Sequence, residues 1–243
     1  MEKKQLTSAS LHILAMGLML CDHLWATVVP GNQWLNTLGR LAYPIFAFLL
    51  VEGYFHTRSV KGYALRLLAL ALVSEIPFNL MYGSRLFYPV HQNVIWTLLI
   101  GLGCICLNEK ARKKGTVPAI GAAAGTILGG GLLGLVTFAD YNAVGVWTIL
   151  VFYFLRGRSW WRLAGQAALL YYLNVEVLKG LAFEVELFGR THFIVQQGFA
   201  LLALVPIWLY RGRKGRGDRW FRWACYGFYP LHMLALHLAR SIL

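Results

Sequence analysis

Apolar runs long enough to cross a lipid bilayer alternate with short clusters of Lys and Arg along this chain. A membrane-spanning helix needs about 20 largely apolar residues, and somewhat fewer where the bilayer thins or charged ends reach water. The runs fall at 8–29, 38–56, 62–82, 93–108, 116–137, 142–156, 161–181, 192–210 and 221–241. The sequence therefore predicts an all-α fold, a polytopic transmembrane helix bundle of about nine spans. The sixth run is short, which leaves eight spans as an alternative.

Composition favours a lipid environment over a soluble one. Of the 243 residues, 58% are hydrophobic and 14% are charged, against about a quarter charged in an ordinary soluble domain. The apolar runs leave no stretch long enough for a soluble domain, so we expect residues 1–243 to form a single transmembrane domain. The net charge of +13 sits in short clusters between the runs, a pattern typical of membrane loops. We therefore expect the bilayer, and no nucleic acid, as a partner.

The basic clusters also orient the chain, because cytoplasmic loops are rich in Lys and Arg. If the N-terminus is cytoplasmic, 18 of the 23 basic residues fall on the cytoplasmic side. They are Lys3, Lys4, Arg58, Lys61, Arg66, Lys110, Arg112, Lys113, Lys114, Arg156, Arg158, Arg162, Arg211, Arg213, Lys214, Arg216, Arg219 and Arg222. Removing one span would scramble this asymmetry, so it supports nine spans and a multi-pass protein of the plasma (inner) membrane.

Polar side chains recur inside the predicted spans, where each is costly without a partner, a water-filled cavity or a function. With the N-terminus inside, they concentrate in the outer half of the membrane. They are Asp22, His23, Arg40, Glu75, Asn79, His91, Gln92, Asn93, Asp140, Asn142, Gln196, Gln197 and His232. A polar chamber that opens outward is the simplest arrangement for them. The alternative is a scatter of interfacial residues that reach toward the headgroups.

His23 is the strongest chemical candidate in this set. Imidazole titrates near neutral pH, so a histidine is suited to general base catalysis. Asp22 precedes it, but neighbours on a helix point about 100° apart, so a carboxylate from another helix, Glu75 or Asp140, is expected to orient the ring. Asp22 has Arg40 as an alternative partner. No second histidine follows His23 at helical spacing, so we assign no metal.

Several stretches of the chain match a known family pattern. They are LMLCDH (18–23), GRLAYPIFAFLLVEGYFHTRSVKGYALRLL (39–68), SEIPFNL (74–80), QNVIWTLLIGL (92–102), ADYNAVGVWTILVFYFLRGR (139–158), QGFALLALVPIWLYRGRKG (197–215) and YGFYPLHMLALHL (226–238). Together they resemble the conjugal-transfer TraX family over nearly the whole chain. The block 39–57 followed by SEIPF is the most specific part of this resemblance.

The resemblance implies an activity and a donor. The named activity of the family is N-terminal acetylation of F-type pilin. The family is remotely similar to a wider group of membrane acyltransferases, which carry acetyl groups from cytoplasmic acetyl-CoA to acceptors on the far face. In that group a histidine in an early helix is catalytic. By position this residue is His23, and Arg40 matches the arginine that heads the next helix.

These observations together predict an acyl-CoA-dependent membrane acetyltransferase. His23 is the expected base, Arg40, Gln92 or Asn93 the expected donors to the developing oxyanion, and Asp22, Glu75 and Asp140 the expected orienting groups. Gln92, Asn93, Asp140 and His232 are the candidates for binding the acceptor. Arg58, Arg66 and Arg156 are the candidates for binding the CoA phosphates.

Two other classes of function fit the same pattern. A small-molecule transporter or permease would use the outward chamber as a substrate site, with matched broken helices in two halves of the chain. A non-catalytic membrane assembly subunit is favoured if the polar residues are closed and pair among themselves. For the enzyme, the expected acceptor is an unidentified peptide, glycan or small molecule with an amine or a hydroxyl.

Overall fold

The computed structural model describes residues 6–187, 189–213, 215 and 219–242. Lys3, Lys4, Lys214 and Arg216, four of the residues used above to orient the chain, lie outside them. Within the described residues, five helical segments are long and apolar enough to cross a membrane. They are α1 (Ser8–Thr27), α2 (Gln33–Gly39) with α3 (Ala42–His56), α4 (Val60–Gly83), α5 (Val94–Arg112) and α6 (Thr116–Val136). The chain is therefore a mostly helical protein with several candidate spans.

The four remaining predicted spans are largely helical but depart from long apolar helices. The sixth corresponds to α7 (Asn142–Phe154). The seventh is α8 (Trp160–Tyr171) followed by a π-helix, η1 (Tyr172–Leu178). The eighth is a 3₁₀-helix, η2 (Gln196–Ala203), with α9 (Leu204–Leu209), and the ninth is α10 (Arg219–Ile242). These segments do not reach the length and apolarity of the first five, so nine spans remain a prediction.

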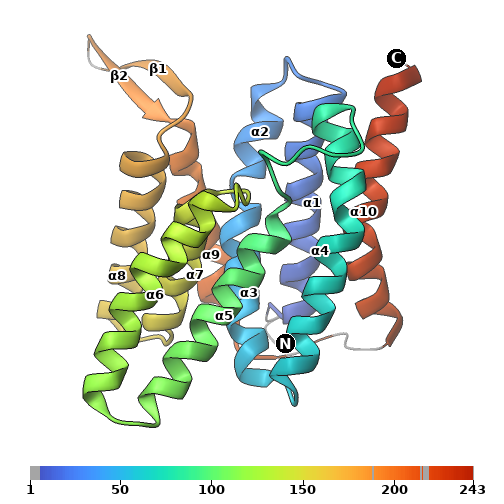
Figure 1. The fold of residues 1–243 in the computed structure, drawn as a ribbon. Helices are drawn as coiled ribbons and strands as arrows, with labels where there is room; N and C mark the ends of the chain where they lie inside the picture. The colour runs from blue at the N-terminus through green and yellow to red at the C-terminus, as the bar shows by residue number, and fades with distance from the viewer. Residues whose placement is uncertain (1–5, 188, 214, 216–218, 243) are drawn as a thin grey trace, which may run out of the picture.

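A β-hairpin corrects the all-α prediction. The strands β1 (Ala182–Leu187) and β2 (Arg190–Val195) pair antiparallel, with Phe183 opposite Ile194. The predicted eighth span began at residue 192, inside β2, so its first residues are wrong. Polar and apolar residues alternate along β1, which is the two-residue period of a strand and not of a helix. The hairpin extends beyond the helices at the end where α10 finishes (Figure 1).

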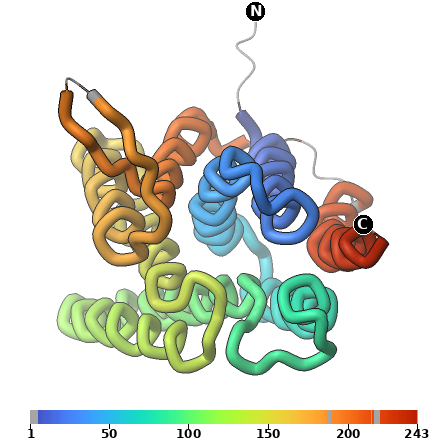
Figure 2. Tube along the Cα trace, turned by 90° about the horizontal axis from the view of Figure 1, so that it is seen from above, coloured from blue at the N-terminus to red at the C-terminus, as the bar shows by residue number. Residues whose placement is uncertain are grey.

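The helices pack around α3. It contacts α1, α5, α7 and η2, and the segment Gln33–His56 is the most enclosed of the five candidate spans. α10 packs on α4 and α1, while α6 packs on α5 and α7 at one edge (Figure 2). Figure 1 shows the first turn of α1 and the last turn of α10 at opposite ends of the bundle. We call the end that carries Ser8 the lower end and the opposite one the upper end, as in that view.

Candidate active site

Arg40 lies at a break in the helix near the upper end. Its backbone N–H closes α2 by donating to Asn36, and α3 begins two residues later. Its guanidinium forms an ion pair with Asp22 of α1, and both side chains are about four-fifths shielded from solvent. Gly39 permits this approach, because a Cβ there would lie 2.9 Å from the Cα of Asp22. The structure thus pairs Asp22 with Arg40, one of the alternatives for Asp22.

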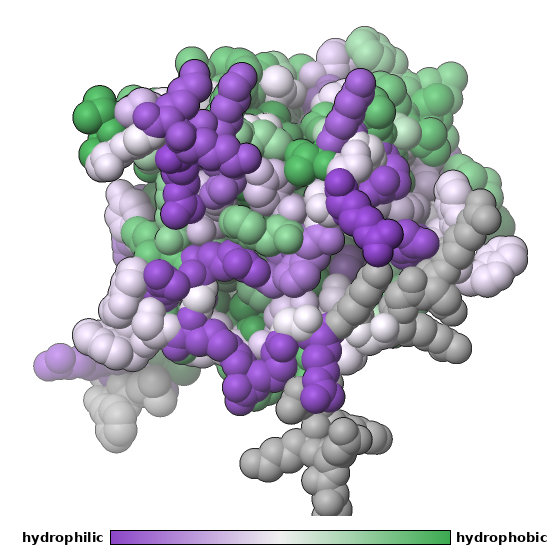
Figure 3. Space-filling model, turned by 90° about the horizontal axis from the view of Figure 1, so that it is seen from below, coloured by the Kyte–Doolittle hydropathy of each residue, from purple (hydrophilic) through white to green (hydrophobic). Residues whose placement is uncertain are grey.

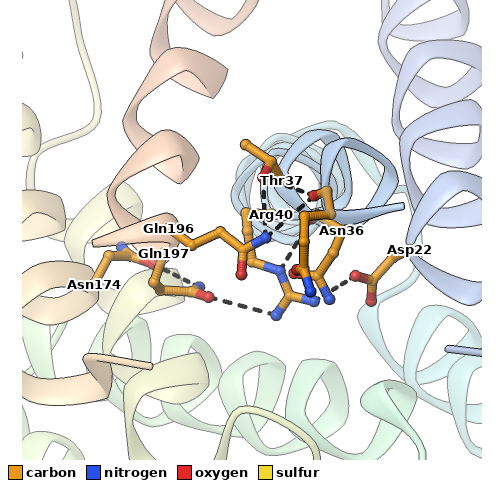
Figure 4. A network of polar contacts seen from close by, with 8 residues as sticks. Asp22, Asn36, Thr37, Arg40, Asn174, Gln196 and Gln197 are labelled. Atoms are coloured by element: carbon orange, nitrogen blue, oxygen red, sulfur yellow. Dashed lines mark hydrogen bonds and ion pairs between the residues drawn. The ribbon is translucent and has the colours of Figure 1, made fainter. Parts of the chain in front are cut away.

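A network of amides extends from Arg40 (Figure 4). The guanidinium donates to Oε1 of Gln197 at 3.4 Å, and the Gln197 amide donates to Oδ1 of Asn174 at 3.0 Å. Gln196 donates to the Thr37 hydroxyl at 2.9 Å. The irregular helices η1 and η2 supply Asn174, Gln196 and Gln197, and such helices often occur at functional sites. These side chains satisfy one another, so this part of the predicted chamber is closed by its own hydrogen bonds.

His23 contacts another histidine in place of the expected carboxylate. Its Nδ1 lies 2.7 Å from Nε2 of His232 on α10, and each residue is only 7% exposed. The two rings are nearly parallel, with centroids 4.9 Å apart. Nδ1 of His232 lies 2.7 Å from the carbonyl oxygen of Phe228. The expectation that Glu75 or Asp140 orients His23 is therefore wrong in this structure.

Asp140 belongs to a second group at the upper end. Tyr82 lies between the two groups, since its ring centroid is 6.0 Å from that of His23 and 5.5 Å from that of His91. Nε2 of His91 is 3.5 Å from the Asp140 carboxylate. Hydrogen bonding to that carboxylate raises the pKa of His91, in the loop before α5, above its ordinary value. This contact therefore favours the protonated form of His91.

Glu75 and Asn93 make contacts that hold helices together, whereas Gln92 makes a contact within the loop before α5. Asn93 caps α5 and is fully buried, and its amide donates to Glu75 at 2.5 Å and to the carbonyl of Ala71. Glu75 also accepts from the Trp96 indole at 3.0 Å. Gln92 donates to the carbonyl of Pro89. The amide donors predicted for an oxyanion are thus already engaged, which leaves Arg40 as the candidate from that set.

A cavity of about 490 Å³ lies among α1, α3, α4, α5 and α10. At the lower end its lining is polar and includes Ser8, His12, Glu52, His56, Arg66 and Arg222. Deeper residues are mainly apolar and include Met16, Met19, Phe46, Leu70, Leu98 and Phe228. Met19 lies about 16 Å along α1 from Ser8 at 1.5 Å per residue. His23 lies one further turn along α1. Phe228, which lines the cavity, contacts the other histidine of the pair, because its ring centroid lies 4.7 Å from that of His232.

The mouth of this cavity contains only part of the predicted basic cluster. Arg66 lines it and lies over the ring of Tyr63 at 5.8 Å. Arg156 instead forms two hydrogen bonds with Glu52, at 2.7 and 3.3 Å, which neutralise that carboxylate. Arg58 is exposed and is absent from the described lining. Hydrophilic side chains gather over the lower face of the molecule (Figure 3).

Sequence reasoning missed several of these residues. Arg222 and His12 line the mouth. The sequence could not show this, because the rotation of each helix about its own axis decides which side chains face the cavity. Asn174 was missed because a π-helix changes which residues share a face. Tyr82 carried no signal, since an aromatic residue near a helix end is ordinary in a membrane protein.

Comparisons with known proteins agree with this architecture. The family model described as "TraX protein" matches residues 7–240. A protein named "Probable fimbrial assembly protein FimC, serogroup H1", from Dichelobacter nodosus, is 31% identical over 103 residues. That match covers 38% of this chain and 42% of the relative. No solved structure matches.

The family match and the apolar helices support the same conclusion. The TraX family model matches residues 7–240, which include almost every residue that the structure describes and both histidines of the buried pair. Several helices have the length and apolarity of membrane spans, so the protein is a multi-pass protein of the inner membrane. The chain belongs to the TraX protein family.

Proposed function

We propose that this chain is a membrane-embedded acyltransferase that moves an acetyl group from cytoplasmic acetyl-CoA to an amine or hydroxyl acceptor at the outer side. The cavity carries the proposal, because it runs from a polar, basic mouth to Phe228, whose ring contacts His232 of the buried histidine pair. Arg66 and Arg222 supply phosphate-binding groups at the mouth. The apolar interior suits the pantetheine arm and its acyl end. The acceptor is a peptide, a glycan or a small molecule.

The chemistry assigned to the chain is general base catalysis by His23. As the acceptor attacks the acyl carbon, the imidazole takes the acceptor's proton. When the carbon–sulfur bond breaks, the imidazolium returns that proton to the leaving thiolate. Arg40 uses three of its five N–H donors on Asn36, Gln197 and Asp22. The two remaining donors are proposed to stabilise the developing oxyanion.

Binding of CoA tests this proposal on the purified protein. We expect acetyl-CoA to bind with an affinity that falls as salt rises, since the phosphate contacts are screened. Arg66→Ala and Arg222→Ala should each weaken binding by about 1.5–3 kcal/mol if a charged hydrogen bond is lost. Arg58→Ala is the matched control and should leave the affinity unchanged. Calorimetry that detects no binding, or equal losses in all three variants, would contradict this assignment.

The proposed topology has nine spans and a cytoplasmic N-terminus, which places the cavity mouth at the cytoplasmic face. Single cysteines in a background without Cys21, Cys104, Cys106 and Cys225 test it by labelling with an impermeant thiol reagent. A cysteine at Arg112 should label from the cytoplasm, and cysteines at Arg85 and Arg190 from the outside. Labelling of positions 112 and 190 from one side would rule out this topology.

A non-catalytic assembly subunit is the second candidate. The closed network around Arg40 favours it, because these polar side chains are satisfied without a substrate. The Dichelobacter nodosus relative is also named as an assembly protein. The two candidates differ in one measurable respect: an assembly subunit would work equally well with His23→Gln, whereas the acyltransferase would not.

A further inference from the structure

The buried histidine pair has a definite order of protons. Nδ1 of His232 lies 2.7 Å from the Phe228 carbonyl oxygen, and a carbonyl oxygen only accepts hydrogen bonds. Nδ1 of His232 must therefore carry a hydrogen. In a neutral imidazole one nitrogen donates and the other accepts, so Nε2 of His232 is the acceptor. The hydrogen between the two rings then belongs to Nδ1 of His23.

This order leaves Nε2 of His23 with the free lone pair. Nε2 makes no hydrogen bond to the residues that the structure describes, and the side chain is 7% exposed. Because His232 is neutral, it can accept the hydrogen bond from His23 without adding a charge inside the membrane, where an unpaired charge is costly. The rings of Phe228, His232 and His23 are nearly parallel, with successive centroids 4.7 and 4.9 Å apart. His232 and His23 lie side by side, as an in-plane N–H···N bond requires, and the contact with Phe228 helps to hold His232 in place.

We infer that His232 is a positioning residue that fixes His23 as the Nδ1–H tautomer and so makes Nε2 its base atom. This inference rests on the proposed acyl transfer. When Nε2 takes the acceptor's proton, the new positive charge is shared through the Nδ1–H bond with Nε2 of His232. When Nε2 returns the proton to the CoA thiolate, the pair recovers its starting order. His232 therefore acts through His23 and contacts neither reactant.

Two substitutions separate this role from simple packing. His232→Phe keeps a ring between His23 and Phe228 but cannot accept a hydrogen bond. His232→Gln loses the ring but keeps an acceptor oxygen. We expect His232→Phe to lower kcat about 10- to 100-fold, the effect of losing one hydrogen bond to a charged group, with KM for acetyl-CoA unchanged. His232→Gln should stay close to the wild type, as should His237→Phe, a control on the same helix.

The tautomer is measured directly by NMR of the full chain in lipid with isotope-labelled histidine. The protein has seven histidines, and the His23 signals are those missing from His23→Gln. We expect the Nδ1–H form in the wild type and in His232→Gln, and a mixture of tautomers in His232→Phe. A wild-type His23 in the Nε2–H form would overturn the inference. So would an active His232→Phe with an inactive His232→Gln, the pattern of a packing role.

The two proposals fail in different ways. If the wild type transfers no acetyl group, the proposed function fails, while the tautomer pattern still shows whether His232 sets the state of His23. If the wild type is active and His23 has the same tautomer in the wild type, in His232→Gln and in His232→Phe, the proposed function stands and the role of His232 is wrong.

Discussion

The His23→Gln protein is expected to fold and to bind acetyl-CoA, yet to transfer acetyl groups about 10²–10⁴ times more slowly than the wild type. Gln has a volume similar to that of His and keeps a hydrogen-bonding amide, but it cannot take a proton near neutral pH. The loss therefore falls on kcat. The measurement is transfer of labelled acetyl from acetyl-CoA, normalised to the amount of folded protein.

Two further variants show whether the loss belongs to His23 alone. His192→Gln is the matched control, because His192 is exposed on β2 of the hairpin, and it should keep wild-type rates. His23→Ala removes a buried ring and leaves a cavity, so it should lose stability as well as activity. A purely structural His23 would give an active Gln variant and a poorly folded Ala variant. Near-wild-type transfer by folded His23→Gln would remove His23 from the mechanism.

Asp22→Asn is expected to lower the free energy of unfolding by about 3–5 kcal/mol, because it leaves the shielded guanidinium of Arg40 without its counter-charge. The double variant Asp22→Asn with Arg40→Gln removes both charges and should recover most of that loss. The measurement is denaturant unfolding in detergent for the two single variants and the double variant. Together with the wild type they form a double-mutant cycle, which yields the coupling energy of the pair.

An exposed ion pair supplies the control for this cycle. Arg112 pairs with Glu109 at 3.1 Å, but its side chain is 64% exposed. Arg112→Gln should therefore cost at most about 1 kcal/mol. If the double variant is as unstable as the sum of the two single variants, Asp22 and Arg40 do not stabilise each other, and the ion pair has no part in holding α1 against the helix break.

The helices were predictable where apolar length alone decides the structure. The runs 8–29, 62–82 and 116–137 became α1, α4 and α6 with ends shifted by at most two residues. The hairpin was missed because the predicted eighth span was defined by hydropathy, which does not distinguish an apolar strand from the start of a helix. The alternation of Ala182–Leu187 was the available signal.

The candidate site was predictable as a set of residues but not as a set of pairs. Asp22 and Arg40 stood out because both are charges inside predicted spans. His23 and His232 are 209 residues apart, and their contact depends on the rotation of α1 and α10. The cavity likewise depends on how five helices meet, so Arg222 was missed and Arg58 was included.

The decisive experiment uses sealed inside-out membrane vesicles that contain the full chain and its native acceptors. Labelled acetyl-CoA is added outside, which is the cytoplasmic face of such vesicles. If acetyl-CoA enters the cavity and His23 acts at its deep end, labelled acetyl should accumulate on material in the vesicle interior, and His23→Gln vesicles should lack it. Equal labelling with the wild type, with His23→Gln and without the protein would contradict the proposed function.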